Sequence, residues 1–208
     1  MGSTDTRRGG AEPTTPQSTL LDHFRSIPWC VPHLSDPAFR RVNMSRTLMQ
    51  PGNGHSLMAE TWNTDKTITH LLSLYRPPIH NGDTTYTHRE TGIGTDSQTR
   101  GEVRRFYTFG TGMNAHPNTL HGGVVATVLD STMGNIIGHQ MPNRLATFTV
   151  ALNVTYKKPV GTPGTIMARS WITRAEGRKI WVHGVIEDGQ GNVHAEAEGM
   201  WLRAKPKL

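Results

Sequence analysis

One helical segment followed directly by four strand-like runs is the feature that most constrains the fold. Residues 122–138 carry apolar side chains at helical spacing. Strand-like runs follow at about 145–157, 164–175, 179–188 and 192–203, separated by short stretches rich in turn-forming residues. A single helix followed by an antiparallel meander predicts an α+β fold in which a curved sheet wraps around a central helix.

The first of these runs alternates with the period of two that a strand requires. Its apolar residues are Phe148, Val150, Leu152, Val154 and Tyr156, and its small or polar residues are Thr149, Ala151, Asn153 and Thr155. This alternation predicts one apolar and one polar face. The stretch Asp188-Gly189-Gln190-Gly191 is typical of a tight hairpin turn, so the last two runs should pair as neighbours.

The N-terminal half is less regular. Residues 1–17 contain little apolar surface to bury, and we expect a disordered tail there. Residues 18–100 predict an extension made of a short helix, a strand at 67–75 and a long polar surface loop at 79–101. The core domain is expected at 101–208, since the clear helix and strand patterns lie in that region.

Composition narrows the classes of partner and compartment. The net charge of +6 favours anionic partners, yet the basic residues are scattered and form no nucleic-acid-binding motif, so a phosphorylated small molecule fits better than nucleic acid. Cys30 is the single cysteine, which predicts a reducing compartment. No apolar run approaches the ~20 residues of a membrane span. We therefore expect a cytoplasmic protein, with a mitochondrial location and myristoylation of Gly2 left open.

The predicted helix carries one carboxylate at the border of its apolar face. At 100° per residue, Val125, Leu129 and Met133 form an apolar stripe, and Asp130 projects onto its edge. A half-buried carboxylate there can serve as a base or nucleophile near neutral pH. An ordinary solvated helix carboxylate is the alternative interpretation, because most such groups are exposed.

The start of the same helix has the composition of an anion-binding site. His121, Gly122 and Gly123 stand at the junction between loop and helix, and Gly123 projects near Asp130, about two turns earlier. Glycines there permit unusual backbone dihedrals and close approach of a ligand. Free N–H groups at a helix start suit an oxygen that gains negative charge, as the carbonyl oxygen of a thioester does during hydrolysis.

These residues resemble a known enzyme family. The sequence from His121 through Asp130 to Gly134 resembles the signature of the PaaI-like branch of hotdog-fold thioesterases, and its continuation is similar to the long-chain acyl-CoA thioesterase branch. Fungal members are similar also in the upstream stretch 27–30, and the stretch 153–159 resembles the strand that follows the helix in that family.

The resemblance implies a hotdog fold, a homodimer or homotetramer with active sites at subunit interfaces, and roles for four residues. The Gly122 N–H would polarise the thioester carbonyl, Asp130 would activate water or attack directly, and Thr149 would position the water or the carboxylate. His121 would organise the loop. Relatives often carry an asparagine at the position of Ala115, where the loop of this chain offers His116 and Asn118 instead.

Further binding residues are expected around this centre. His116 and Asn118 lie in the loop before the helix, and Gly123 would let a substrate approach the backbone. Lys157 and Lys158 follow the first strand and are candidates for the phosphates of coenzyme A, although a solvated, charged strand end is the slightly favoured interpretation for each lysine taken singly. No HExxH motif or cysteine cluster is present, so we expect neither a metal nor another cofactor.

Three function hypotheses remain open at this point. The first is hydrolysis of an acyl-CoA or acyl-carrier thioester. The second is another reaction on the same fold, such as dehydration, isomerisation or a tailoring step in specialised, polyketide-like secondary metabolite biosynthesis, because fold does not fix chemistry. The third is a non-catalytic acyl-binding protein, which the joint presence of Asp130 and the two glycines disfavours.

Overall fold

The computed structural model describes residues 17–42, 46–52, 54–79, 97, 99–141 and 145–205. The predicted tail, apart from its last residue, lies outside these ranges, as does most of the loop predicted at 79–101. None of the helices in the described ranges is long and apolar enough to cross a bilayer.

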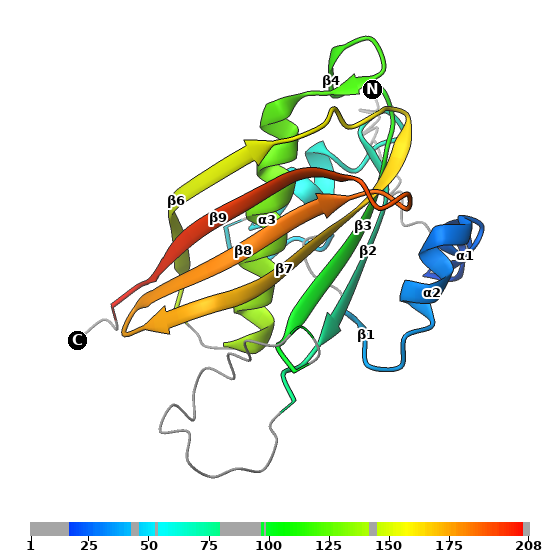
Figure 1. The fold of residues 1–208 in the computed structure, drawn as a ribbon. Helices are drawn as coiled ribbons and strands as arrows, with labels where there is room; N and C mark the ends of the chain where they lie inside the picture. Colours follow the sequence, from blue (N-terminus) through cyan, green and yellow to red (C-terminus); the bar gives the residue numbers. More distant parts are fainter. Residues whose placement is uncertain are drawn as a thin grey trace, which may run out of the picture.

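A seven-stranded antiparallel sheet curves around one long helix, α3 (Figure 1). The strand order is β1-β2-β3-β7-β8-β9-β6, which makes β6 an edge strand. The strands are β1 (Arg40–Val42), β2 (Ile68–Arg76), β3 (Glu102–Phe109), β6 (Thr147–Tyr156), β7 (Gly164–Glu176), β8 (Lys179–Glu187) and β9 (Val193–Arg203). The helix α3 spans Gly122–Gln140, and a small hairpin of β4 (Asn114–His116) and β5 (Thr119–Leu120) precedes it. The expected α+β class and hotdog fold are confirmed.

The helix α3 packs its apolar stripe against the inner face of the sheet. Val125, Leu129 and Met133 are buried as their spacing predicts, and they join side chains of β2, β3, β7, β8 and β9 in the main core. The buried surface of the helix is wider than predicted. The helical projection predicts that Asn135 lies on the side opposite that stripe, yet Asn135 is 5% exposed. The prediction of a solvent-facing side is wrong there, because the sheet curves around α3 and more than one stripe of the helix meets protein.

The alternation predicted for β6 is interrupted by a β-bulge. The pairing of β6 with β9 shifts register between Thr149 and Ala151, so Val150 is the extra residue. An extra residue exchanges the two faces of a strand from that point on. Leu152 and Val154 pack against the main core, whereas Phe148 and Val150 are 61% and 55% exposed. The prediction of one continuous apolar face is therefore wrong.

The N-terminal segment covers the opposite face of the sheet. It consists of α1 (Gln17–Arg25), η1 (Pro28–Cys30) and α2 (Val31–Leu34), which lie beside β2 and β3 in Figure 1. Phe24 and Cys30 are fully buried in a second core with Leu72, Leu74, Phe106 and Met167 of the sheet. The extension is thus a packed part of the fold. A π-helical turn, η2 (Leu57–Thr61), precedes β2.

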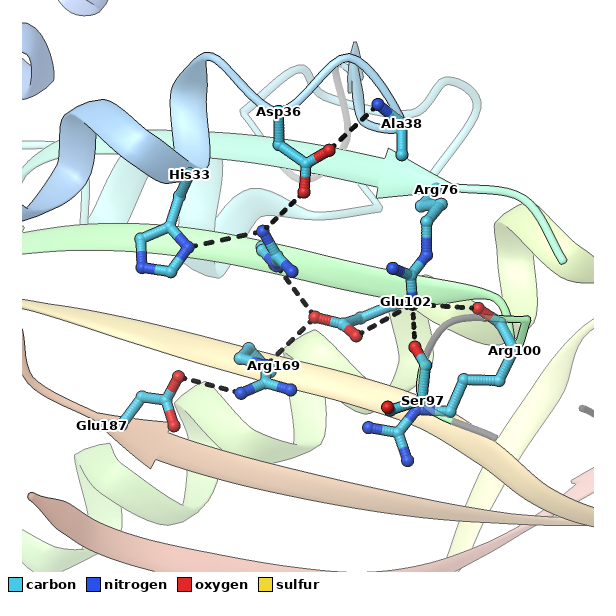
Figure 2. Close-up of polar contacts among 10 residues, drawn as sticks. His33, Asp36, Ala38, Arg76, Ser97, Arg100, Glu102, Arg169 and Glu187 are labelled. Atoms are coloured by element: carbon cyan, nitrogen blue, oxygen red, sulfur yellow. Dashed lines mark hydrogen bonds and ion pairs between the residues drawn. The ribbon is translucent and has the colours of Figure 1, made fainter. Parts of the chain in front are cut away.

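A buried carboxylate ties this segment to three strands. Glu102, 1% exposed, faces Arg76, Arg104 and Arg169 at 3.3, 2.9 and 3.0 Å (Figure 2). Arg104 also lies 3.4 Å from Asp36 in the loop after α2. Burial alone would raise the pKa of Glu102, but the three guanidinium groups outweigh it and hold that pKa below its ordinary value.

Candidate active site

A pocket of about 420 Å³ opens at the N-terminal end of α3. Its walls come from the β4–β5 hairpin, the first turn of α3 and the segment that ends β6. Four of the predicted site residues line it: Gly122, His116, Lys157 and Lys158. Folding therefore brings together residues that lie up to 42 positions apart, between His116 and Lys158.

The backbone at the helix start presents one open donor. His121 is the N-cap of α3, and its Nδ1 accepts a 2.8 Å hydrogen bond from the Gly123 N–H. The His121 carbonyl accepts from the N–H groups of Val124 and Val125, which polarises the peptide that carries the Gly122 N–H. Within the described part of the chain, the Gly122 N–H itself has no acceptor. It stands at the positive end of the helix dipole, where an oxyanion is stabilised.

The two glycines leave space for neighbouring groups and do not adopt unusual backbone dihedrals. Neither Gly122 nor Gly123 has a positive φ, so the expectation of a special backbone conformation is wrong. A Cβ on Gly123 would lie 3.0 Å from His121 Nδ1 and would crowd the cap. A Cβ on Gly122 would meet the Tyr156 ring at 3.5 Å, an ordinary contact that would narrow the pocket wall.

Asp130 and Thr149 meet across the gap between α3 and β6. The Thr149 hydroxyl donates a 2.8 Å hydrogen bond to Asp130 Oδ1, and the carboxylate is half-buried. The β-bulge explains how a residue on the predicted polar face reaches the helix, since it reorients the strand at this point. The hydrogen bond fixes one carboxylate oxygen and leaves the other available for chemistry.

Asp130 and Gly122 do not share a site within one chain. They are eight residues apart on α3, which corresponds to roughly 12 Å along the helix axis. Reacting groups must approach to about 3 Å, so these two cannot act on the same thioester carbon from one copy of the helix. Asp130 and Thr149 accordingly do not line the pocket that contains Gly122.

The two lysines stand at the pocket rim with partners of their own. Lys157 Nζ lies 2.7 Å from Glu196 Oε2 in β9, and Lys158 Nζ donates to Asn192 Oδ1 in the turn before β9. Both side chains remain exposed, so each retains donors for an incoming anion.

Of the two loop residues expected to replace the missing asparagine, only His116 lines the pocket. Asn118 sits in the β4–β5 turn with a φ of 55°, and its carbonyl accepts from the Thr162 N–H. The turn conformation accounts for Asn118, because asparagine tolerates the left-handed region. Its predicted substrate contact is not supported by this placement.

Tyr156 is a pocket residue that was not singled out in the sequence. Its hydroxyl donates a 3.0 Å hydrogen bond to the Gly122 carbonyl, and its ring forms part of the wall. The apolar alternation places it on the strand but cannot show that it reaches the helix start, since that contact spans 34 residues. Among the described residues, no three His, Cys, Asp or Glu side chains are grouped closely enough to hold a metal ion.

Comparisons with known proteins point in one direction. A family model described as "Thioesterase superfamily" matches residues 117–195. Acyl-coenzyme A thioesterase THEM4 of Mus musculus is 29% identical over 92 residues, which cover 44% of this chain and 38% of that protein. An uncharacterized mitochondrial protein of Candida albicans (strain WO-1) is 25% identical over 87 residues, covering 42% and 39%. The chain thus spans about two fifths of the length of these curated relatives.

Among solved structures, a Bacillus halodurans protein crystallised with CoA is similar to this chain. It is 30% identical, with a TM-score of 0.46, and the match covers 54% of this chain and 72% of that one.

Proposed function

We propose that this chain, which belongs to the thioesterase superfamily, hydrolyses an acyl thioester to a free acid and a thiol. The observation that carries the proposal is the open Gly122 N–H, set in the pocket wall at the start of α3. Donors that are fixed before the reaction stabilise the carbonyl oxygen as it gains negative charge. Dehydration and isomerisation are less favoured, because the helix carries both this donor and a carboxylate held by Thr149.

The chemistry needs one oxygen nucleophile and one departing thiolate. The Gly122 N–H holds the thioester oxygen, while Asp130 either removes a proton from water or attacks the carbonyl carbon itself. When water attacks, the new C–O bond forms, the C–S bond breaks, and the thiolate takes up the proton that Asp130 removed from water. When Asp130 attacks, the C–S bond breaks as an anhydride forms between the acyl group and Asp130; water then hydrolyses this anhydride to the free acid and the Asp130 carboxylate, and a proton of that water goes to the thiolate. Thr149 orients the Asp130 carboxylate through its 2.8 Å hydrogen bond. His121 organises the helix start as its N-cap and moves no proton in this scheme.

A second copy of the chain completes the site in this proposal. The helical rise separates Gly122 from Asp130 by roughly 12 Å, so each site takes Gly122 from one protomer and Asp130 from the other. The edge strand β6 supplies a matching surface, since Phe148, Val150 and Tyr156 are each more than half exposed. Unpaired edges with exposed apolar side chains are suited to association. A homodimer, with a homotetramer as its extension, is therefore part of the proposal.

The substrate proposed is an acyl-CoA. The pocket rim carries Lys157 and Lys158, whose ammonium groups suit the phosphates of coenzyme A. A carrier-bound acyl group also presents a phosphopantetheine, so an acyl carrier protein is the second candidate. The location proposed for the protein is the cytoplasm. Mitochondria are the second candidate, because the name of the Candida albicans relative calls that protein mitochondrial. Microscopy of the tagged chain distinguishes the two.

Thiol release from a panel of thioesters tests the proposal. Fatty acyl-CoAs of several lengths are compared with aryl and polyketide-type thioesters, since a role in secondary metabolite biosynthesis predicts turnover of the latter group. Asp130→Asn removes the base without changing shape. Asp22→Asn is the matched control, because that carboxylate is 69% exposed on α1 and far along the chain from the site. Turnover lost only in Asp130→Asn supports hydrolysis, and no turnover on any substrate rejects it.

A further inference from the structure

The hairpin turn between β8 and β9 touches the N-terminal segment on one side and the pocket on the other. Gly189, in that turn, lies directly against Trp29 of η1: a Cβ built on Gly189 would fall 1.9 Å from Trp29 Cγ and 2.3 Å from Cδ1. Only glycine permits this contact, because no Cβ approaches another carbon so closely. Trp29 also packs on Phe106, with ring centroids 6.0 Å apart, so its ring has a fixed place on the sheet.

Asp188 sets the shape of the same turn. One of its carboxylate oxygens accepts the backbone N–H groups of Gln190 and Asn192 at 2.8 and 3.0 Å. The other accepts the Asn192 side-chain amide at 3.0 Å. Burial would raise the pKa of Asp188, but its hydrogen bonds lower that pKa to about 2, so the carboxylate stays charged.

His194 carries this arrangement to the pocket wall. Its Nδ1 lies 2.7 Å from the Pro159 carbonyl oxygen and its Nε2 lies 3.3 Å from Asp188 Oδ2. These two contacts hold the imidazole between the pocket wall and the turn. The His194 carbonyl in turn accepts the backbone N–H groups of Lys157 and Lys158 at 2.8 and 3.0 Å.

Asn192 adds a contact to the lysine side chains themselves, since its Oδ1 accepts from Lys158 Nζ. The β8–β9 hairpin therefore binds both the backbone of residues 157–158 and the ammonium group of Lys158. The route from Trp29 to the pocket runs through Gly189, Asp188 and then His194.

We infer that Trp29 is a positioning residue for the phosphate-binding wall of the pocket, acting through the β8–β9 turn on Lys157 and Lys158. The inference rests on the proposed function. Trp29 lies outside residues 117–195, the region that the family model matches, so substrate binding would depend on a residue beyond that region. The N-terminal segment then selects for thioesters that carry the CoA phosphates. It leaves the chemistry at Asp130 unchanged, because Trp29 touches neither α3 nor β6 in the contacts described.

The test compares two substrates with the same acyl group. Acyl-CoA carries the phosphates that the lysines would bind, and the corresponding S-acyl-N-acetylcysteamine carries none. Trp29→Ala should raise KM for acyl-CoA about fivefold to tenfold, the loss expected when one charged contact is misplaced. Its kcat, and KM for the phosphate-free substrate, should change by less than about twofold. Gly189→Ala, which displaces the ring from the other side, should act in the same direction, and Trp29→Phe should restore KM in part.

A double variant separates positioning from general loss of structure. If Trp29 acts through the lysines, adding Trp29→Ala to a variant that carries both Lys157→Ala and Lys158→Ala should make KM for acyl-CoA no worse than the two lysine changes do alone. Additive effects, or equal losses on both substrates, would overturn the inference. If no substrate is turned over, calorimetric titration of the protein with CoA measures binding in place of KM. CoA binding that Trp29→Ala leaves unchanged rejects this inference alone, whereas absence of both turnover and CoA binding rejects the proposed function with it.

Discussion

The Thr149 hydroxyl donates a 2.8 Å hydrogen bond to the Asp130 carboxylate, joining the edge strand β6 to the central helix. We expect Asp130→Asn to lower kcat about 10²-fold to 10⁴-fold, the usual contribution of a positioned base. Thr149→Ala should lower kcat about tenfold, because it removes one hydrogen bond to a charged group. Thr149→Ser keeps the hydroxyl and is the matched control. Steady-state thiol release measures all three, and equal activity of Thr149→Ala and wild type would contradict an orienting role.

Gly122→Ala should separate stability from activity. The backbone there is helical and a Cβ would meet Tyr156 at an ordinary 3.5 Å, so the chain should fold and gain up to about 1 kcal/mol of stability. The methyl group narrows the pocket at the oxyanion donor, so kcat/KM should fall about tenfold or more. Thermal unfolding and kinetics on the same sample check this. Full activity in a stable Gly122→Ala variant would argue against a carbonyl bound at this N–H.

His121→Ala should destabilise the protein by about 1 kcal/mol through loss of the N-cap of α3. Asparagine is a strong N-cap residue, so His121→Asn should restore most of that stability. If the imidazole only organises the helix start, His121→Asn should also retain kcat. Urea unfolding and thiol release are measured side by side. A stable His121→Asn variant with a large loss of kcat would show that the imidazole takes part in the chemistry.

Glu102→Gln should cost about 3–5 kcal/mol, because three arginines would remain around a neutral group. The folded state lowers the pKa of Glu102 below its ordinary value of 4.5, so the stabilisation is present above pH 4.5. It is lost as pH falls through the folded-state pKa. The difference in unfolding free energy between wild type and Glu102→Gln should therefore be constant near neutral pH and shrink in acid. Denaturant titrations at pH 7 and below pH 4.5 measure it, and a gap that widens in acid would contradict the assignment.

Cys30 should be unreactive while the protein is folded. It is fully buried in the second core, and burial raises the pKa of its thiol to about 12, so almost no thiolate is present at neutral pH. A chromogenic disulfide should detect no thiol in the native protein and one thiol per chain after unfolding. Rapid reaction of the native protein would mean that the N-terminal segment leaves the sheet.

The sequence was sufficient for the features that depend on local pattern. The helix from Gly122, the four following strands and the turn at 188–191 come from spacing and turn chemistry, which act over a few residues. The His-Gly-Gly start and Asp130 also lie on one helix, so their relation follows from helical geometry alone.

Contacts between distant segments were decided only by tertiary structure. The bulge at Val150 brings Thr149 to Asp130. The alternation of apolar residues does not predict this bulge, because the bulge depends on how β6 pairs with β9. The contacts of Tyr156 with Gly122, of Glu102 with Arg76 and Arg169, and of Trp29 with Gly189 likewise join residues that lie 26 to 160 positions apart. The chain's periodicity identifies the helix and the strands, but only the packing of α3 and the N-terminal segment on opposite faces of one sheet selects the side chains that meet.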